Sequence, residues 1–254
     1  MLLDGKKGLI LNVANKNSIA WAIAKAAADQ GAQVGVGAQN GRMLKNVEKL
    51  IDGDGRFSPF TVDFTSEEDM ASLPEKVEAT YGKIDFLVHC AAFAPREALS
   101  GRFIETTQAD FETAMNVSCY SFIDVCKRLE NCLNDDASVM TLSYLGSTRL
   151  VSEYKVMGVA KAALESATRY LAMDLGVRGI RVNTLSPGPI NTLAARGVKN
   201  LTEMIASVQD KTPLKRKYDQ EEVGQNAVYL MSDLSKGITG QILFIDSGYN
   251  ILGV

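Results

Sequence analysis

Hydrophobic positions along the chain fall into two kinds of segment that alternate from one end to the other. Short apolar runs bounded by glycine or polar residues predict strands, and longer segments with apolar residues every three to four positions predict helices. The predicted strands cover residues 8–14, 33–37, 57–62, 84–89, 138–142, 180–185 and 241–246. The predicted helices cover residues 19–30, 42–51, 67–81, 108–129, 152–175 and 221–232.

This alternation predicts the α/β class, with parallel strands joined by right-handed crossovers through the helices. The expected architecture is one doubly wound parallel sheet of about seven strands with helices on both faces. No repeat, low-complexity tract or linker divides the 254 residues, so we expect one domain. The irregular stretches 91–106 and 186–201 follow predicted strand ends. Because such sheets bind ligands at the carboxyl ends of their strands, these two loops are expected to hold substrate.

Composition and charge narrow the class of protein. Apolar residues make up 46% and charged residues 22% of the chain, which is typical of globular proteins. The 27 basic and 30 acidic residues give a net charge of -3, which predicts neither a nucleic-acid nor a membrane surface. No apolar run reaches the roughly 18 residues of a membrane span, and the first residues are too polar for a secretory signal. We therefore expect a cytoplasmic protein.

The cysteines and the single histidine offer little to metal or nucleophilic chemistry. Cys90, Cys119, Cys126 and Cys132 contain no CxxC pair, and two of them lie one heptad apart in an apolar helical pattern. This predicts core packing in a reduced compartment rather than metal ligands or disulfides. A histidine-dependent triad or a multi-histidine metal site would have to use His89 alone. His89 is therefore expected to be structural, and acid–base chemistry must come from other side chains.

The turn after the first predicted strand is the candidate site for a dinucleotide pyrophosphate. The N-terminus of the helix at 19–30 would face it with free amides and the positive end of the helix dipole. Ser18 is placed to cap that helix and to donate to phosphate. The turn carries Asn12 and Ala14 but no glycine, so an ordinary strand–helix turn stays open as the alternative.

Three further positions fit a nicotinamide dinucleotide. Gln39 ends the second strand, where an acidic residue often binds the adenosine ribose; glutamine can still bond a hydroxyl, which favours NADH, while Arg42 keeps NADPH open. Asp63 follows the third strand and would either accept from the adenine amino group or cap the next helix. The small residues Cys90 and Ala91 would form a platform under the nicotinamide ribose or a tightly packed strand end.

A tyrosine and a lysine seven positions apart, Tyr154 and Lys161, are the candidate catalytic pair. On the predicted helix at 152–175 this spacing is about two turns, so both side chains would project from one face. The chemistry favours such a pair, because a phenol with a pKa of about 10 is a poor acid or hydrogen-bond partner for an enolate unless a cation lies close. Glycine and alanine residues on the same helix predict close packing against its neighbours.

Several motifs resemble those of bacterial enoyl-acyl-carrier-protein reductases, a branch of the short-chain dehydrogenase/reductase superfamily with a Rossmann-like fold. They stand in the same order and at matching intervals over residues 5–253: Ser-Ile-Ala at 18–20, Phe-Ala-Pro at 93–95, Leu-Ser-Tyr-Leu-Gly at 142–146, the Tyr154/Lys161 pair, and Gly-Pro-Ile-Asn-Thr-Leu-Ala-Ala at 188–195. Two features are specific to this branch, the Phe-Ala-Pro loop and a second tyrosine, Tyr144, ten residues before Tyr154.

The resemblance implies NADH-dependent reduction of the trans-2 double bond of an enoyl thioester in fatty acid synthesis. Hydride from the nicotinamide would add to the β-carbon, while Tyr154 bonds the thioester oxygen as it becomes an enolate and Lys161 holds the nicotinamide ribose. A homotetramer is also implied, with a lid within about 188–210 that closes over the substrate. The implied substrate contacts are Phe93, Ala94, Tyr144, Met157 and Leu193. The implied cofactor contacts are Ala14, Ser18, Ile19, Gln39, Asp63, Phe64, Cys90, Ala91, Lys161, Pro189, Ile190 and Thr192.

The chain departs from the family pattern at several positions. Asn12 and Ala22 stand where the family tends to carry glycine, and Asn191 stands where a basic residue is common. Lys199 alone remains of a basic cluster that in the family meets the acidic carrier protein. The basic residues that could take the place of the others are Lys211, Lys215, Arg216 and Lys217. The expected substrate is therefore a thioester of acyl-carrier protein or of CoA.

Two other functions stay open. Thr141 lies where the broader superfamily keeps a carbonyl-binding serine, and Asn116 lies where it keeps a proton-relay asparagine. A carbonyl or 3-ketoacyl reductase is therefore the main alternative. The missing glycines of the cofactor turn also allow a non-catalytic nucleotide-binding protein, against which the intact Tyr154/Lys161 pair argues.

Overall fold

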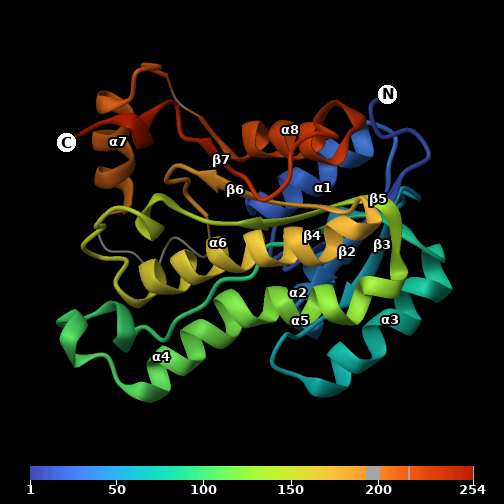
Figure 1. Cartoon of the computed structure of the whole chain (residues 1–254), viewed down its shortest axis with the longest axis horizontal. Coiled ribbons are helices and arrows are strands. Elements are labelled where there is room, and N and C mark those ends of the chain that lie inside the picture. The colour runs from blue at the N-terminus through green and yellow to red at the C-terminus, as the bar shows by residue number, and fades with distance from the viewer. Residues whose placement is uncertain (193–200, 217, 254) are drawn as a thin grey trace.

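The sheet has the parallel, doubly wound arrangement that the sequence predicts. In the computed structural model, which describes residues 1–192, 201–216 and 218–253 (the backbone alone at 201–204), seven parallel strands pair in the order β3-β2-β1-β4-β5-β6-β7 (Figure 1). The strands are β1 (Lys7–Leu11), β2 (Gln33–Ala38), β3 (Phe57–Thr61), β4 (Ile84–His89), β5 (Leu133–Leu142), β6 (Arg181–Pro187) and β7 (Ile242–Ile245). The strand order changes direction between β1 and β4, and sheets of this kind bind ligands at the strand ends beside that point.

Helices cover both faces of the sheet (Figure 1). Helices α1, α2 and α8 share one buried apolar cluster with the strands, and α3, α5 and α6 share another. Helix α7 lies at one end of the molecule, next to the C-terminus. The bounds are α1 (Ile19–Asp29), α2 (Gly41–Leu50), α3 (Glu67–Tyr81), α4 (Gln108–Met115), α5 (Ser121–Leu129), α6 (Val156–Leu175), α7 (Leu201–Lys211) and α8 (Gln220–Met231).

Burial on both sides of the sheet explains why the central strands read as uninterrupted apolar runs. In β4, Phe86, Leu87 and Val88 are all fully buried. Phe86 and Val88 belong to the cluster with α1 and α8, whereas Leu87 belongs to the cluster with α3, α5 and α6. A parallel strand covered by helices on both faces has no solvent side, so every position favours an apolar residue. The predicted fold class is confirmed.

Two element boundaries differ from the prediction because of single residues with positive φ. The first strand, predicted over 8–14, ends at Leu11, because Asn12 has a φ of 67° in the left-handed region. The helix predicted from residue 152 begins at Val156, because Lys155 has a φ of 41° and a ψ of -119°. Tyr154 therefore lies in a turn before α6 rather than on the same helix as Lys161.

The predicted helix at 108–129 is interrupted in its hydrogen bonding. A π-helical segment, Asn116–Tyr120, separates α4 from α5. Such segments are rare and occur frequently at functional sites. Helix α7 lies in the stretch predicted as a lid, where the hydrophobic pattern predicts no helix. The part of that lid at 193–200 lies outside the described residues.

Helices α1 and α8 pack unusually closely through small residues. A Cβ at Gly224 of α8 would lie 2.7 Å from the carbonyl oxygen of Ala22 on α1. Ala22 is buried in this contact, so an alanine is accommodated between the two helices at this position.

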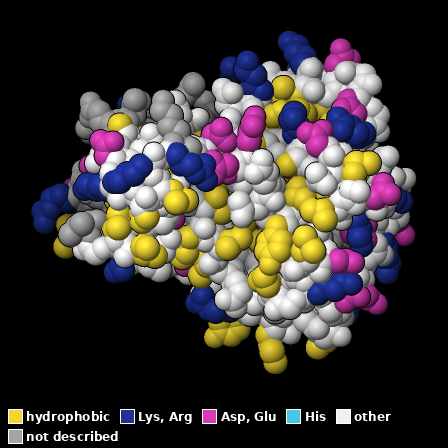
Figure 2. Space-filling view, turned by 90° about the horizontal axis from the view of Figure 1, so that it is seen from above, with side chains coloured by type: hydrophobic (Ala, Val, Ile, Leu, Met, Phe, Trp, Pro, Cys, Tyr) yellow, Lys and Arg dark blue, Asp and Glu magenta, His cyan; other side chains and the backbone are white. Residues whose placement is uncertain are grey.

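The surface carries both signs of charge. On the face shown in Figure 2, basic and acidic side chains both occur, with hydrophobic side chains between them. Within the described part of the chain, no helix combines the length and apolar character that crossing a membrane requires.

Replacing Gly8 with alanine should destabilise the protein. The added Cβ would lie 2.2 Å from the ring of Phe86, which is fully buried in the core. Overpacking of this kind costs about 1–3 kcal/mol, so thermal unfolding should occur several degrees lower. Gly176→Ala is the matched control, since Gly176 has a helical φ of -62° and open space around it. Equal midpoints for the two variants would contradict this packing of β1 against β4.

Candidate active site at the carboxyl end of β5

Tyr144, Tyr154 and Lys161 meet around the carboxyl end of β5. The strand ends at Leu142, and Tyr144 follows two residues later. The rings of Tyr144 and Tyr154 are in edge contact, with centroids 4.9 Å apart and planes at 70°. The Lys161 ammonium donates to the Leu142 carbonyl oxygen, with the two atoms 2.7 Å apart. The structure thus brings the three predicted catalytic residues to one strand end, although Tyr154 is not on the helix.

Two glycines make room for the Tyr154 ring. A Cβ at Gly146 would lie 2.5 Å from that ring. A Cβ at Gly158 on α6 would lie 2.7 Å from the carbonyl oxygen of Gly146. Side chains at either position would push α6 away from the segment that follows β5. The close packing predicted for this helix is therefore a requirement of the site itself.

Lys155 forms the turn that places Tyr154. Its backbone lies in a region that residues other than glycine rarely adopt, and strain of this kind concentrates at functional sites. The Met157 amide closes the turn by donating to the Tyr154 carbonyl at 2.9 Å. The Lys155 ammonium donates to the carbonyls of Leu99 and Gly101 in the loop after β4. Sequence reasoning missed Lys155, because lysine is not a residue type that signals positive φ.

Burial shifts the ionisation of all three side chains. Desolvation raises the pKa of Tyr154 well above its ordinary value, and the nearby Tyr144 raises it further. Desolvation also raises the pKa of Tyr144 to about 12. Burial lowers the pKa of Lys161 to about 8, although neighbouring groups oppose this shift. At neutral pH both phenols therefore keep their protons, and the ammonium is still the main form of Lys161.

The loop after β4 carries the predicted acyl-site residues Phe93 and Ala94. Phe93 is 53% exposed, and Ala94 packs against a small buried cluster. The Phe93 amide donates to Ser118 Oγ at 2.9 Å, and the Ser118 hydroxyl lies 3.0 Å from the Phe93 carbonyl oxygen. The same hydroxyl lies 3.6 Å from the sulfur of the buried Met157 on α6. Ser118 thus joins the predicted substrate residues, and sequence reasoning missed it because a lone serine in a helical pattern has no distinguishing spacing.

Helix α1 begins with a side-chain cap of the predicted kind. Ser18 Oγ accepts from the Trp21 amide and donates to the Asn15 carbonyl oxygen. Ala14 and Ile19, on either side of this turn, are partly buried. The first amides of a capped helix remain available to an anion, so the turn can hold a pyrophosphate.

Asn12 adopts a backbone conformation that glycine would favour. Asparagine is among the residues that tolerate positive φ, which Asn12 adopts. Its side-chain amide donates to the Cys90 carbonyl oxygen at 3.0 Å, which ties the end of β1 to the end of β4. Beside it Ala91 is buried, and burial raises the pKa of the Cys90 thiol to about 12. Cys90 is therefore a neutral, small residue of the strand end.

Gln39 and Asp63 lie partly buried just after β2 and β3. The Asp63 carboxylate accepts from the amide and hydroxyl of Thr65. The cap of α3 is Ser66, so the helix-capping alternative for Asp63 is wrong. After β6, the structure places Pro189 and Ile190 in buried positions and Thr192 in a partly buried one. The predicted substrate residue Leu193, together with Lys199 and Lys217, lies outside the described residues.

The residues of the carbonyl-reductase alternative do not join this site. Thr141 is fully buried, and its hydroxyl lies 3.1 Å from His89 Nδ1. His89 Nε2 lies 2.8 Å from Ser121 Oγ, and the His89 ring is in edge contact with Phe64. Asn116 is exposed where the π-helical segment begins. His89 therefore has the structural position that the sequence predicts, and it uses Thr141 as its partner.

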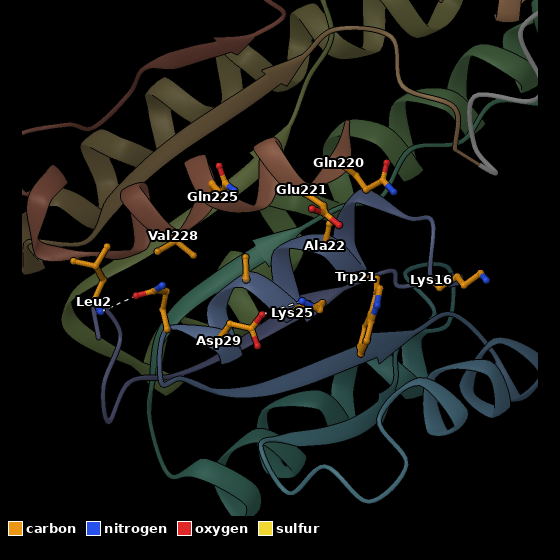
Figure 3. A pocket seen from close by; sticks show the side chains of 12 residues that line it. Leu2, Lys16, Trp21, Ala22, Lys25, Asp29, Gln220, Glu221, Gln225 and Val228 are labelled. Atoms are coloured by element: carbon orange, nitrogen blue, oxygen red, sulfur yellow. Dashed lines mark hydrogen bonds and ion pairs between the residues drawn. The ribbon is translucent and has the colours of Figure 1, made fainter. Parts of the chain in front are cut away.

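A separate groove of about 500 Å³ lies between α1 and α8 (Figure 3). Its lining includes Trp21 and Lys25 of α1, and Glu221 and Gln225 of α8, whose side chains are drawn in the figure. Lys25 pairs with Asp29 on the same helix. Among the described residues, none of the predicted catalytic or substrate residues lines this groove, so it is distinct from the described part of the candidate site.

Comparisons with known proteins agree with one another. A model of the family described as enoyl-(acyl carrier protein) reductase matches residues 13–250. An enoyl-[acyl-carrier-protein] reductase [NADH] of Rhizobium meliloti is 45% identical over 253 residues, covering 100% of this chain and 93% of the relative. The enzyme of the same name from Bacillus cereus is 41% identical, covering 99% of each chain.

Solved structures show the same likeness. The Bacillus cereus enoyl-acyl carrier protein reductase with NADP+ and indole naphthyridinone has a TM-score of 0.96 at 40% identity, covering 100% of this chain and 99% of the other. The Anaplasma phagocytophilum enoyl-(acyl-carrier-protein) reductase in complex with NAD has a TM-score of 0.95 at 39% identity, covering 100% and 97%.

Replacing His89 should reduce the loss of unfolding free energy that accompanies a fall in pH below neutral. Desolvation and, to a smaller extent, the charge of Lys161 lower the pKa of His89 to about 3, whereas an unfolded histidine titrates near 6.5. Between these values the unfolded chain binds a proton that the folded chain does not, so stability falls as the pH drops. By about pH 5 this loss is about 2 kcal/mol. His89→Gln removes the only histidine, and the change in unfolding free energy between about pH 7.5 and 5, measured in urea, should shrink by that amount. An unaltered pH dependence would rule out a neutral buried His89.

Proposed function

Because this chain belongs to the enoyl-(acyl-carrier-protein) reductase family, we propose that its reaction runs through Tyr154, Lys161 and Tyr144. The chain is an oxidoreductase that uses NADH to reduce the trans-2 double bond of enoyl-acyl-carrier-protein thioesters in fatty acid synthesis. One observation carries the assignment of residues: Tyr144 contacts Tyr154 beside the Lys161 ammonium at the end of β5.

The residues beside β1 and β4 fit NADH. The capped start of α1 offers free amides to the pyrophosphate, and the neutral Gln39 after β2 suits an unphosphorylated adenosine ribose. The buried ammonium of Lys161 would hold the nicotinamide ribose hydroxyls. The other residues proposed to contact the cofactor are Ala14, Ser18, Ile19, Asp63, Phe64, Cys90, Ala91, Pro189, Ile190 and Thr192.

Tyr154 would act on the charge that develops on the substrate. NADH supplies the hydride that forms the new C–H bond at the β-carbon. The electron pair of the double bond then moves toward the thioester oxygen, which becomes an enolate oxygen until the α-carbon takes a proton. Burial keeps Tyr154 protonated, so its O–H donates to that oxygen where the transition state builds charge. The nearby Lys161 ammonium favours the same charge.

The acyl group would lie between the loop after β4 and the start of α6. Phe93 and Ala94 from the loop, Tyr144 and Met157 supply apolar surface on the described side of this site. Leu193 is proposed for the same wall. The hydroxyl of Ser118 ties the loop to Met157, which keeps the wall in one arrangement.

Carbonyl reduction has less support. The Thr141 hydroxyl is engaged with His89 in the core, and Asn116 is exposed, so neither is placed to bind a carbonyl or relay a proton to Lys161. A non-catalytic nucleotide-binding role also has less support, because the partly buried Tyr154 and the buried Lys161 are both present at one strand end.

The assembly and surroundings belong to the same proposal. The chain would act as one domain, with a lid within about 188–210 that includes part of α7. It would form a homotetramer in the cytoplasm, with no nucleic-acid or membrane partner. A second copy would cover exposed apolar side chains on α4, the π-helical segment, α5 and α6. They are Phe111, Tyr120, Ile123, Tyr170 and Met173.

The first test compares substrates by following the oxidation of NADH spectroscopically. We expect turnover with an enoyl thioester such as crotonyl-CoA, and more efficiently with the same acyl group on acyl-carrier protein. Acetoacetyl-CoA should not be reduced, and NADPH should be a poorer cofactor. Turnover of the keto thioester alone would overturn the assignment and would require a carbonyl site that Thr141 does not supply.

Tyr154→Phe should lower kcat for the enoyl thioester by roughly 10²–10³-fold, because it removes the one donor to the developing enolate. The KM for NADH should change little, since the ring and its contact with Tyr144 remain. Tyr229→Phe, at a partly buried position of α8, is the matched control and should turn over at the wild-type rate. A kcat within twofold of wild type in Tyr154→Phe would exclude the proposed role.

A further inference from the structure

A buried carboxylate lies one helical turn beyond Lys161. Glu165 follows Lys161 by four residues on α6, a spacing that places two side chains on the same face of a helix. Glu165 is only 4% exposed and Lys161 only 3%. Long charged side chains are almost never buried to this extent unless they are paired. Each of the two side chains therefore needs a polar partner close by.

The same two side chains hold consecutive residues at the end of β5. Lys161 donates to the Leu142 carbonyl, and the hydroxyl of Ser143 donates to the Glu165 carboxylate at 2.5 Å. The Ser143 amide donates to the Leu185 carbonyl of β6 at 2.8 Å. Tyr144 is the next residue along the chain. The start of α6 is thus fastened to the strand end that carries Tyr144 by one bond to each charged group.

The other titratable groups around Lys161 carry no negative charge at neutral pH. Among the described residues, the groups that act on its ammonium are His89 of β4, Cys90 after it, Cys119 of the π-helical segment and Glu165. Burial raises the pKa of both thiols, to about 12 for Cys90, and lowers the pKa of His89 to about 3. Glu165 is therefore the group whose carboxylate can balance the buried ammonium.

Other buried charged residues of the described chain have partners elsewhere. Arg181 donates to Ser235 and to the Ser232 carbonyl, and the Asp246 carboxylate accepts from the amides of Gly248 and Asn250. None of these contacts involves α6. The Lys161–Glu165 pair is thus a local arrangement of the candidate site.

We propose that Glu165 is a positioning residue of the reaction, whose carboxylate keeps Lys161 protonated and, through Ser143, holds the end of β5 in place. The proposal rests on the proposed function only in taking Lys161 as the residue that binds the nicotinamide ribose. Without the carboxylate, desolvation would act on Lys161 unopposed, and the ammonium would lose its proton at a lower pH.

The experiment follows NADH affinity, by the fluorescence of bound NADH, across the pH range from about 6 to 10. In wild type the affinity should fall as the pH rises through about 8, where Lys161 loses its proton. Glu165→Gln keeps an oxygen acceptor for Ser143 but removes the charge. The loss of NADH affinity should therefore occur at a pH lower by about one unit or more. Near pH 8 this gives NADH binding roughly fivefold weaker than in wild type. The same displacement should appear in kcat/KM.

Two variants separate charge from hydrogen bonding. Ser143→Ala removes the hydrogen bond but leaves the carboxylate. The midpoint of its loss of NADH affinity should therefore stay at the wild-type pH. Glu165→Asp keeps the charge and should restore most of the affinity lost in Glu165→Gln. A midpoint that is the same in Glu165→Gln and wild type would overturn the proposal, as would a displacement in Ser143→Ala as large as that in Glu165→Gln.

Wild type alone provides a test if Glu165→Gln does not fold. NADH affinity that already falls between about pH 6 and 7 would contradict a carboxylate that keeps the Lys161 ammonium protonated at neutral pH. NADH binding does not depend on which thioester is reduced. A displaced midpoint without turnover of any enoyl thioester would therefore support the role of Glu165 while removing the proposed reaction.

Discussion

The buried ammonium of Lys161 constrains everything around it. An ammonium that has lost nearly all contact with water needs an oxygen atom close by, and the carbonyl of Leu142 supplies it, while the charge of Glu165 opposes the loss of its proton. Strand β5 must therefore end beside α6, and α6 must approach the segment that follows the strand. Gly146 and Gly158 are small for that reason. Once helix and strand end are this close, the contact between the Tyr144 and Tyr154 rings follows.

The layers of the fold were accessible from sequence because burial on two faces leaves a strong pattern. The run Phe86-Leu87-Val88 is apolar at every position since helices cover both sides of β4. The start of α6 was not accessible, because the helical pattern continues back through Tyr154 while the backbone of Lys155 departs from it. The π-helical segment between α4 and α5 also escaped, since one extra residue in a turn barely alters the spacing of apolar positions.

The residues of the candidate site were also predictable from the sequence only in part. Tyr144, Tyr154, Lys161 and Phe93 stand in motifs whose order and spacing are readable without a structure. Glu165 and Ser118 do not, because a single glutamate or serine on a helix is usually a solvent-facing residue and only the fold reveals its burial. Asn12 shows the opposite case: the sequence marks a missing glycine, and the structure retains the glycine-like backbone and adds a bond to Cys90.

The turn at Lys155 limits how this position can change during evolution. A residue branched at Cβ would meet its own backbone at positive φ, so valine, isoleucine and threonine are the substitutions least compatible with the turn. Glycine and asparagine accept the conformation, but neither reaches the carbonyls of Leu99 and Gly101 as the lysine does. A change to glycine or asparagine would therefore relieve the backbone strain but lose the two hydrogen bonds that hold the loop after β4. Homologues that carry glycine or asparagine here must hold the loop after β4 by some other contact.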